Sequence, residues 1–539
     1  MKKNLIIILS LVGLLLLSLT VGITGWYLEH SKVSELQAHV SELQQEEKRH
    51  AIDKSVSDQM GVIASQQRDI AEEKQEEAEK EKRRADEAFQ RSELERKKAE
   101  QAEREARLEK EKADQERQNA EMARRNAEAS ERIAKIERNK ADTLRYQSLG
   151  RSLGSASLQA YSANQLDMAQ LLAYYAYHYT TQYGGVVYFP DVFQSLLNAS
   201  HSIQSWSKHR GMLRGIGFLP KNDGRIVTVC DYGTILIHTK IVNQQKTTMK
   251  TDTLLSNRKY DFRYVYANPK GTIYAISRSG HFVVIENCDK KKTRVIPVLE
   301  KDHPFSFWVL DNQKVTIVGE QSLAEIDLNL PDKNAVVEER PMGFKIETNG
   351  HIGNQLLLFD NQHNEHIVKD IRHIDTSPVP VPGKVTAFNN SRFFRAYGME
   401  DGTIYLLKNG SNDYIKLLGH ESRISQLKMT DDRLYSAGYD GKVNFWYINN
   451  EKIEPMELFS KKCWILDFAV SADLAYCWIG DKYGYITEAL LEVPKMKEII
   501  ETELRQKQRD FTEEEWNYYI GKATPYQPII IPNRKEVSR

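Results

Sequence analysis

The stretch GHESRISQLKMTDDRLYSAGYDGKVNFWYINN, residues 419–450, has the layout of one structural repeat. A Gly-His pair precedes a strand of alternating polar and apolar residues. A second strand, an Asp-Gly turn and a third strand that contains Trp446 follow. One such unit cannot bury its own apolar face, so further units are expected elsewhere in the chain.

Similar units recur along the second half of the chain. A turn followed by a strand is found at Gly233, Gly280, Ser322, Asn361, Gly402, Gly441 and Gly484. These positions are spaced by about 42 residues on average, and a period of about 40–45 residues is typical of propeller blades with four short strands each. The sequence therefore predicts an all-β seven-bladed propeller over residues 201–492, in which the units at Ser322 and Asn361 are degenerate.

Residues 419–450 also resemble a blade of the WD-repeat (Trp-Asp repeat) family. In that family a His, a strand Ser or Thr, a turn Asp and a Trp form a hydrogen-bonded set inside a blade. The matching residues are His420, Ser436, Asp440 and Trp446. Tyr447 replaces the Asp that ends the family signature, and we expect the other units to lack both the His and the Trp. The resemblance implies a structural role for the set, not a catalytic one.

The last unit supplies only three strands, near residues 463–470, 475–479 and 484–490, before a segment with helical spacing. An unpaired sheet edge favours aggregation, so a fourth strand must come from elsewhere. The extended stretch HSIQSWSK, residues 201–208, precedes the first full blade and has no other assignment. We predict that it is the outer strand of the blade that contains Gly484, which would join both ends of the ring.

The N-terminal segment LIIILSLVGLLLLSLTVGITGWYL, from Leu5 to Leu28, contains no charged residue. As a helix it is about 36 Å long, against about 30 Å of bilayer hydrocarbon. Trp26 and Tyr27 stand at its end, where interfacial aromatic residues are common. The alternative is a cleaved signal peptide, but its apolar part is usually about 7–15 residues long. The sequence predicts a transmembrane anchor at residues 1–28.

The charges beside this anchor predict its orientation. Lys2 and Lys3 precede it, so the positive-inside rule keeps the N-terminus in the cytoplasm. The propeller of this single-pass membrane protein is then expected outside, on the periplasmic side. A cytoplasmic propeller is the alternative, because the charge asymmetry is small.

Residues 29–145 are predicted to form a coiled-coil stalk. Ala recurs every seven residues from Ala71 to Ala141, interrupted only by Ser92, and charged residues or Gln fill most positions between. The second core position is assigned to Leu94, Gln101, Leu108, Gln115, Met122, Ala129 and Ile136. Small and polar side chains bury little apolar area, so we expect a weak homo-oligomer through the coil. A solvated single helix held by Glu-Lys pairs four residues apart is the alternative.

Two helical segments flank the predicted propeller. Residues 146–200 lose the charge and show apolar stripes at helical spacing, which predicts a packed helical hairpin with a third short helix after Pro190. Residues 493–539 are predicted to be a short helical tail. In this tail Thr512 and Glu515 have the spacing of a capping box, and Gly521 stops the helix.

The order of these parts is similar to that of the C-terminal halves of bacterial caspase-like and STAND-type NTPase proteins that end in WD-repeat propellers. The tail QRDFTEEEWNYYIGKATPYQP matches their pattern at Glu514, Glu515, Trp516 and Tyr519. The chain contains no Gly-x-x-x-x-Gly-Lys-Ser/Thr phosphate loop. The resemblance therefore implies a signalling or defence system whose effector is on another chain.

The composition favours binding over catalysis. The 75 basic and 75 acidic residues give zero net charge, which argues against nucleic acid as a partner. The cysteines lack metal-ligand spacing, and His363 and His366 lie in a turn of a degenerate blade, expected to be solvated. We expect no catalytic residue, no metal and no cofactor.

The sequence as a whole predicts a multi-domain, membrane-anchored scaffold or sensor that is not an enzyme. It is expected to bind a protein partner through one face of the propeller, because loops on a rigid scaffold commonly bind partners. The alternative is an extracytoplasmic propeller enzyme or small-ligand binder with its site in the central channel.

Overall fold

The computed structural model describes residues 112–219, 224–243, 246–310, 313–411 and 413–531. The expected membrane anchor at residues 1–28 and most of the expected stalk lie outside the described residues. Among the helices that the structure describes, none combines the length and apolar character needed to cross a bilayer.

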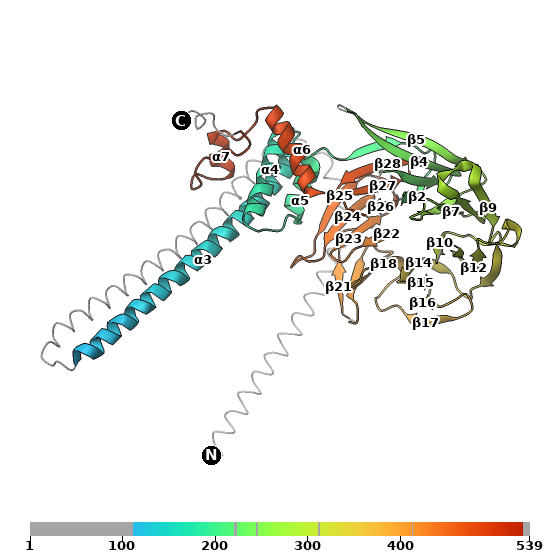
Figure 1. The fold of residues 1–539 in the computed structure, drawn as a ribbon, viewed down its shortest axis with the longest axis horizontal. Helices are drawn as coiled ribbons and strands as arrows, with labels where there is room; N and C mark the ends of the chain where they lie inside the picture. Colours follow the sequence, from blue (N-terminus) through green and yellow to red (C-terminus); the bar gives the residue numbers. More distant parts are fainter. Residues whose placement is uncertain (1–111, 220–223, 244–245, 311–312, 412, 532–539) are drawn as a thin grey trace, which may run out of the picture. The chain divides into compact units, whose positions relative to one another are not determined.

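The segment from β1 to β28 forms seven four-stranded antiparallel sheets arranged in a ring (Figure 1). We number these blades along the chain by their innermost strands. Blade 1 contains β2 (Leu213–Phe218), β3 (Ile226–Cys230), β4 (Thr234–Asn243) and β5 (Lys246–Ser256), and blade 2 contains β6 (Phe262–Ala267), β7 (Ile273–Ser277), β8 (His281–Ile285) and β9 (Thr293–Pro297). Blade 3 contains β10 (Ser306–Val309), β11 (Lys314–Val318), β12 (Ser322–Asp327) and β13 (Val336–Pro341), and blade 4 contains β14 (Ile346–Ile352), β15 (Gln355–Asp360), β16 (Asn364–Val368) and β17 (Ile374–Pro378).

The remaining three blades complete the ring. Blade 5 contains β18 (Val385–Asn390), β19 (Phe394–Met399), β20 (Ile404–Lys408) and β21 (Tyr414–Leu417), and blade 6 contains β22 (Ile424–Met429), β23 (Arg433–Gly438), β24 (Lys442–Tyr447) and β25 (Pro455–Ser460). Blade 7 contains β26 (Ile465–Val470), β27 (Tyr476–Asp481), β28 (Tyr485–Leu490) and β1 (Gln204–Ser207). The predicted seven-bladed propeller is confirmed, and the degenerate units at Ser322 and Asn361 are complete blades.

Apolar side chains fill the spaces between neighbouring blades. Each of the seven hydrophobic clusters among the described residues joins two adjacent blades. Trp446 of blade 6, for example, lies in one cluster with Leu406 and Ala396 of blade 5. Full burial of a large apolar side chain contributes about 1.5–3 kcal/mol, so strands that are buried along their whole length, such as β3 and β7, stabilise the ring against the blades on both sides.

The innermost strand carries a β-bulge at the same place in six of the seven blades. Its register against the second strand shifts by one residue directly after the first pair. The extra residues are Arg214, Arg263, Glu347, Thr386, Ser425 and Leu466. Because a bulge turns one side chain in a new direction, these six residues occupy equivalent places at the start of their strands.

Side chains of some innermost strands hold the backbone of the next innermost strand. Asn389 Oδ1 accepts a hydrogen bond of 3.0 Å from Met429 N, and Gln426 Oε1 accepts one of 2.8 Å from Phe468 N. Both links run from one blade to its successor. They satisfy backbone donors that the four-stranded ladder leaves unpaired.

The ring closes between strands from opposite ends of the propeller sequence. β1 pairs antiparallel with β28, and Gln204 lies opposite Glu488. Ser205 Oγ is 2.7 Å from Thr487 Oγ1, and the ring of Trp206 stacks on that of Trp478 at 5.9 Å. The predicted outer strand of the blade that contains Gly484 is confirmed.

Within the described ranges, five α-helices accompany the propeller. They are α3 (Lys112–Ser162), α4 (Leu166–Gln182), α5 (Pro190–Ala199), α6 (Val493–Gln506) and α7 (Glu513–Tyr519), and three short 3₁₀ helices lie at η1 (Glu286–Cys288), η2 (Lys290–Lys292) and η3 (Asp332–Asn334). α3 passes residue 145 without a break, so the described part of the expected stalk and the first helix of the hairpin are one helix, about 77 Å long at 1.5 Å per residue. The hairpin, the third helix after Pro190 and the helical tail are present as predicted.

The described part of α3 contradicts the seam assigned from the sequence. Met122 and Ile136 project about 40° apart around the helix, whereas Ala127 and Ala134 project from its other side. Residues two apart, such as Ala127 and Ala129, project about 200° apart around an α-helix. The Ala positions and the second core positions therefore cannot share one face, and that seam is wrong.

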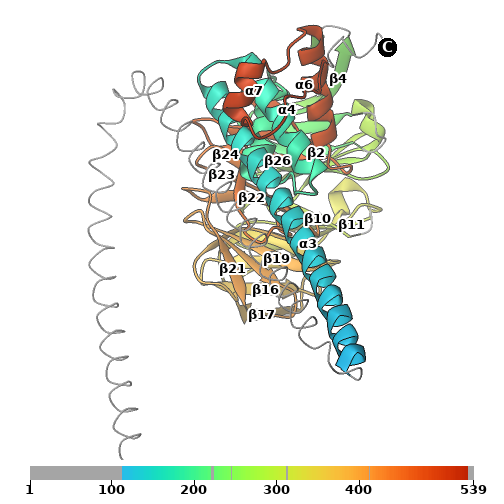
Figure 2. The ribbon, with the colours of Figure 1, turned by 90° about the vertical axis from the view of Figure 1, so that its left-hand side faces the viewer.

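The helices before and after the propeller form one bundle, which the two ribbon views show (Figures 1 and 2). Gln170 of α4 donates from Nε2 to Glu503 Oε2 of α6 at 2.6 Å. Asp510 accepts hydrogen bonds from Tyr175 OH at 2.6 Å and from the backbone of Ile530 and Ile531. The C-terminal segment is thus held directly on α4.

Local capping agrees with the sequence in the tail. Thr512 and Glu515 form both hydrogen bonds of a capping box at the start of α7. Gly521 follows the helix with φ of 99°, a conformation that glycine adopts without steric cost.

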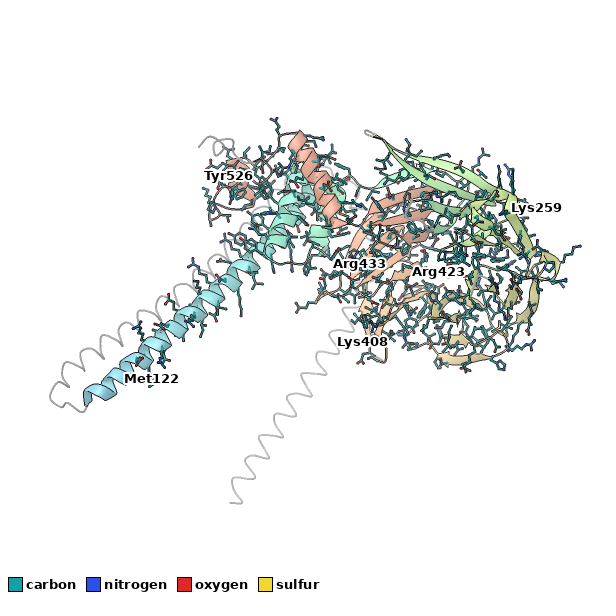
Figure 3. The ribbon with its side chains drawn as sticks, in the orientation of Figure 1. Met122, Lys259, Lys408, Arg423, Arg433 and Tyr526 are labelled. Carbon is teal, nitrogen blue, oxygen red and sulfur yellow. The ribbon has the colours of Figure 1, made fainter. Side chains whose placement is uncertain are left out.

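An aromatic cluster attaches the bundle to blade 6. Arg433 donates from Nη2 to Tyr188 OH at 3.1 Å (Arg433 is labelled in Figure 3), and Asn450 Nδ2 donates to Tyr188 O at 2.6 Å. The Tyr188 ring also lies 4.7 Å from that of Tyr447. The residue that replaces the signature Asp of the WD repeat therefore contacts the helical bundle.

Candidate functional site

The four residues singled out in blade 6 form one buried hydrogen-bonded chain. His420 Nδ1 is 3.0 Å from Asp440 Oδ2, and His420 Nε2 is 2.8 Å from Ser436 Oγ. Trp446 Nε1 donates to the same Ser436 Oγ at 2.8 Å. Burial acts to raise the pKa of Asp440, but hydrogen bonds from His420 and from two backbone N–H groups outweigh it and lower that pKa. The chain ties the start of β22 to β23 and β24 and has the structural role that the resemblance implies.

Blade 1 contains a variant of this chain that the sequence analysis missed. His209 Nε2 is 2.7 Å from Thr228 Oγ1, and Thr228 Oγ1 is 2.6 Å from His238 Nε2. His209 precedes β2 as His420 precedes β22, and His238 takes the place of the Trp. The expectation that every other unit lacks the His is therefore wrong.

Burial keeps both imidazoles of blade 1 neutral near pH 7. It lowers the pKa of His209 to about 4 and that of His238 to about 3. A neutral imidazole donates from one nitrogen and accepts at the other, so the hydroxyl of Thr228 can join the two rings in a single directed chain. The polar groups satisfy one another inside the blade, without a ligand.

In blade 4, His363 and His366 have different hydrogen-bond partners. His366 Nε2 is 3.0 Å from Asp360 Oδ2, and His366 Nδ1 is 2.9 Å from Thr376 Oγ1. Both His366 and Asp360 are buried, so the expectation of a solvated cluster is wrong for them. His363 instead lies 2.9 Å from Gly383 O through Nδ1. Within the described ranges, no group of three or more His, Cys, Asp or Glu side chains is placed to hold a metal ion.

The innermost strands of all seven blades begin at the same end of the ring, which we call the top face. Because strand direction alternates within each blade, the turns between second and third strands and the links between blades open on this face.

Five aromatic side chains gather on the top face of three consecutive blades, numbers 6, 7 and 1. We call this set the aromatic patch: Tyr439, Trp464, Tyr483, Tyr485 and Tyr232. Trp464, Tyr483 and Tyr232 are 41%, 58% and 54% exposed. Exposed rings that share one face of a folded domain are characteristic of interaction surfaces.

Cations lie over several of these rings. Tyr439 stacks on Trp464 with ring centroids 5.0 Å apart, and Lys482 Nζ is 4.3 Å from the Trp464 centroid. Lys461 Nζ lies 4.0 Å from the centroid of Tyr485. Arg423, labelled in Figure 3, has its guanidinium carbon 6.0 Å from the centroid of Tyr439. These contacts hold both rings and cations in place before any partner arrives.

Charged residues continue from the patch along the top face. Lys384 lies 3.2 Å from Glu347 and 3.5 Å from Glu400, and Arg423 lies 3.9 Å from the same Glu400. The bulge residue Arg214 is partly buried; burial and the nearby Arg263 lower the pKa of its guanidinium. The signs alternate from Glu347 through Lys384 and Glu400 to Arg423, so these four charges neutralise one another.

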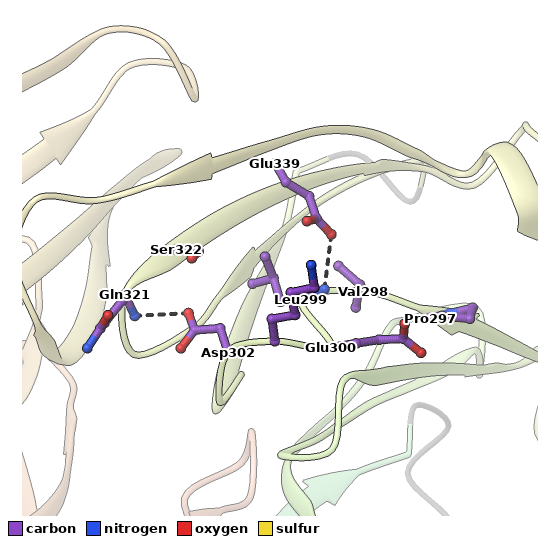
Figure 4. Close-up of a pocket in the computed structure, with 9 residues that line it drawn as sticks. Pro297, Val298, Leu299, Glu300, Asp302, Gln321, Ser322 and Glu339 are labelled. Atoms are coloured by element: carbon purple, nitrogen blue, oxygen red, sulfur yellow. Dashed lines mark hydrogen bonds between the residues drawn. The ribbon is translucent and has the colours of Figure 1, made fainter.

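A pocket of about 330 Å³ lies between blades 2 and 3 (Figure 4). Two of its carboxylates accept hydrogen bonds from the backbone: Gln321 N donates to Asp302 Oδ2 at 2.9 Å, and Leu299 N donates to Glu339 Oε1 at 3.0 Å. These two hydrogen bonds fix the segment that links blade 2 to blade 3.

Polar side chains also meet on the innermost strands. The rings of Trp308 on β10 and His351 on β14 lie 4.3 Å apart. Burial lowers the pKa of His351 and, on β22, that of Lys428, whose positive charge lowers the pKa of His351 further. These three residues come from different blades, but no acidic group of the described residues completes a catalytic set with them.

The aromatic patch was not predicted from the sequence. Its members come from three units and gather only because the ring places the last blade beside the first. A signal was nevertheless present, because Tyr232 and Tyr483 each stand directly before a turn glycine, Gly233 and Gly484. That position puts the side chain at the tip of a turn on the top face.

No family model matches the chain, and no curated protein matches it. A crystal structure of the WD40 β-propeller domain of Doa1 is similar, with a TM-score of 0.45 and 12% sequence identity over 54% of this chain and 96% of that chain. The class, a seven-bladed propeller with a WD-type blade, rests on the strand pairing and on the chain from His420 to Trp446.

Proposed function

We propose that the protein is a membrane-anchored scaffold or sensor whose propeller binds a protein partner through the aromatic patch. The observation that carries the proposal is the restriction of the patch to blades 6, 7 and 1, with cations already seated on its rings. It acts by binding, and we assign it no catalytic step.

The composition of the patch fits a protein interface. Trp, Tyr and Arg are the residues most often found as binding hot spots, where truncation costs about 2 kcal/mol or more. Stacked rings lose little conformational freedom on binding, because Tyr439 and Trp464 already hold each other. The charged row beside the patch adds orientation more than affinity.

The remaining parts of the proposal come from the sequence. The uncharged segment from Leu5 to Leu28 supports a membrane anchor, and Lys2 and Lys3 support a propeller outside the cytoplasm. The tail pattern around Trp516 supports a bacterial signalling or defence system with its effector on another chain. In this arrangement the stalk is a spacer between membrane and binding head.

The partner-binding part is tested by affinity capture of the full-length chain from cross-linked cells. Wild type is compared with a Trp464→Ala/Tyr483→Ala variant. The matched control is Phe393→Ala, an exposed aromatic residue in the turn between β18 and β19, which opens on the opposite face. Proteins recovered with wild type and with the control should be lost with the double variant. Recovery of the same proteins by all three chains would contradict the proposed patch.

The membrane part has separate tests. The full-length chain should stay in the membrane fraction after carbonate extraction, and a soluble form beginning near residue 25 would indicate a cleaved signal instead. A reporter that is active only in the cytoplasm, fused after Arg539, should be inactive. Activity of that reporter would place the propeller inside the cell.

A further inference from the structure

The first part of α3 carries an exposed apolar stripe. Met122, Ile133, Ile136 and Leu144 are 61%, 58%, 54% and 65% exposed. On a helix with 3.6 residues per turn they project within about 80° of one another. Met122 lies near the described start of α3, away from the helical bundle (Figure 3). Large apolar side chains along one side of an otherwise charged helix indicate a face that packs against a partner.

This stripe follows a heptad that differs from the Ala repeat. With Ile133 at position a and Ile136 at position d, the neighbouring heptads place Asn126 and Lys140 at a, and Met122, Ala129 and Thr143 at d. The repeated alanines then fall at position b, outside the seam. β-branched residues at a and a buried Asn at a favour two parallel strands in register, since each Asn pairs with its counterpart.

The flanking charges favour the same arrangement. Arg132 occupies position g, and Glu137 occupies position e of the next heptad. In a parallel pair, g of one helix faces the following e of the other, so Arg132 faces Glu137 twice across the interface. In an antiparallel pair g faces g, which would set arginines against each other.

We propose that α3 forms a parallel two-stranded coiled coil with a second copy of this chain over residues 122–143, with Asn126 fixing the register. The association is weak, because Lys140 faces its counterpart and Ala129 and Thr143 bury little apolar area. The inference concerns the oligomeric state and does not depend on the proposed partner.

Disulfide trapping of the full-length chain tests the arrangement. Ala129→Cys puts a thiol at a d position, where the two copies meet only if the pair is parallel and in register. Glu131→Cys puts one at position f, on the outer side, and serves as the matched control. Mild oxidation should convert Ala129→Cys to a reducible dimer, while Glu131→Cys and wild type, with its native cysteines, stay monomeric on denaturing gels.

Charge exchange adds an independent readout in the Ala129→Cys background. Arg132→Glu should weaken association by about fivefold, because two ion pairs become two repulsions, and Arg132→Glu/Glu137→Arg should restore it. Equal trapping at positions 129 and 131 would indicate random collision and overturn the proposal. Absence of trapping at 129 would also overturn it, whether the cause is an antiparallel pair or coverage of the stripe by another segment of the same chain.

Discussion

The backbone N–H of Ile216 donates a hydrogen bond of 2.6 Å to Oδ2 of Asp467, across the interface between blade 1 and blade 7. Asp467 is almost fully buried, and burial raises the pKa of its carboxyl to about 7, although hydrogen bonds from Ile216, Phe468 and Gln426 favour the charged form. A carboxyl group with this environment makes the closure of the ring sensitive to pH.

The sign of this effect follows from the proton count. Between about pH 4 and pH 7 the folded chain keeps the Asp467 proton and the unfolded chain has lost it, so this group lowers stability as pH rises. His209 and His238 act in the opposite direction below about pH 6.5, because the unfolded chain binds their protons and the folded chain does not.

Asp467→Asn should therefore separate the two contributions. The free energy of unfolding of the variant minus that of wild type should rise from pH 4 to pH 7 and then level, with a total change on the order of a few kcal/mol at about 1.4 kcal/mol per pKa unit. Urea unfolding at a series of pH values measures the difference. A constant difference would show that the carboxyl group has an ordinary pKa in the folded chain.

Ser436→Ala should destabilise the propeller by about 1–3 kcal/mol. The substitution leaves Trp446 Nε1 and His420 Nε2 buried without the hydroxyl that both contact. Ser425 is the matched control, since its buried Oγ has no hydrogen-bond partner among the described residues. Ser425→Ala should be neutral or slightly stabilising in the same thermal or chemical unfolding experiment, and equal losses for the two variants would refute the role of the chain.

Removal of β1 should prevent normal closure. A chain that begins at Arg210 lacks the partner of β28 and should aggregate or lose cooperative unfolding, because the blade 7 edge is then open. A chain that begins at Lys140 retains β1 and the helical bundle and should fold. A chain that begins at Pro190 retains β1 but exposes Met496, Ile500 and Leu504 of α6, so it should unfold at a lower temperature. Equal melting of all three chains, measured by differential scanning fluorimetry, would disprove the closure argument.

Asp510→Ala should release the C-terminal segment. The carboxylate accepts from Tyr175 OH and from the backbone of Ile530 and Ile531, and its loss leaves these donors unpaired. Limited trypsin digestion should cut near Arg505 or Arg509 many times faster than in wild type. Asp167→Ala removes only the exposed ion pair with Lys507 and should change the rate little. Identical digestion of both variants would contradict the assigned role of Asp510.

The fold was largely predictable because its signals are local and periodic. The turn glycines such as Gly441 set the period, and the missing fourth strand of the last unit pointed to the segment around Trp206. His209 was missed because Thr228 and His238 replace the serine and tryptophan of the motif, although the geometry is preserved. A search by residue type cannot detect a chain of contacts that is rebuilt from different side chains.

The candidate site was less predictable because its residues come from three different blades, which only the folded ring brings together. Tyr439 and Trp464 stack, but they belong to a turn of blade 6 and to the link into blade 7. The stalk shows the reverse problem. Its strongest periodicity, the Ala repeat, lies away from the apolar stripe of Met122 and Ile136, since regular spacing alone does not say which side of a helix packs.

The pairing of β1 with β28 also has a consequence for synthesis. Ser205 and Thr487 are 282 positions apart, so a ribosome that adds about 5–20 residues per second needs roughly 15–55 s to produce the second strand after the first. Throughout that interval β1 is an open edge that carries Trp206. The nascent chain therefore finishes its last blade only after translation of the propeller is complete, and protection by chaperones matters most for this one short strand.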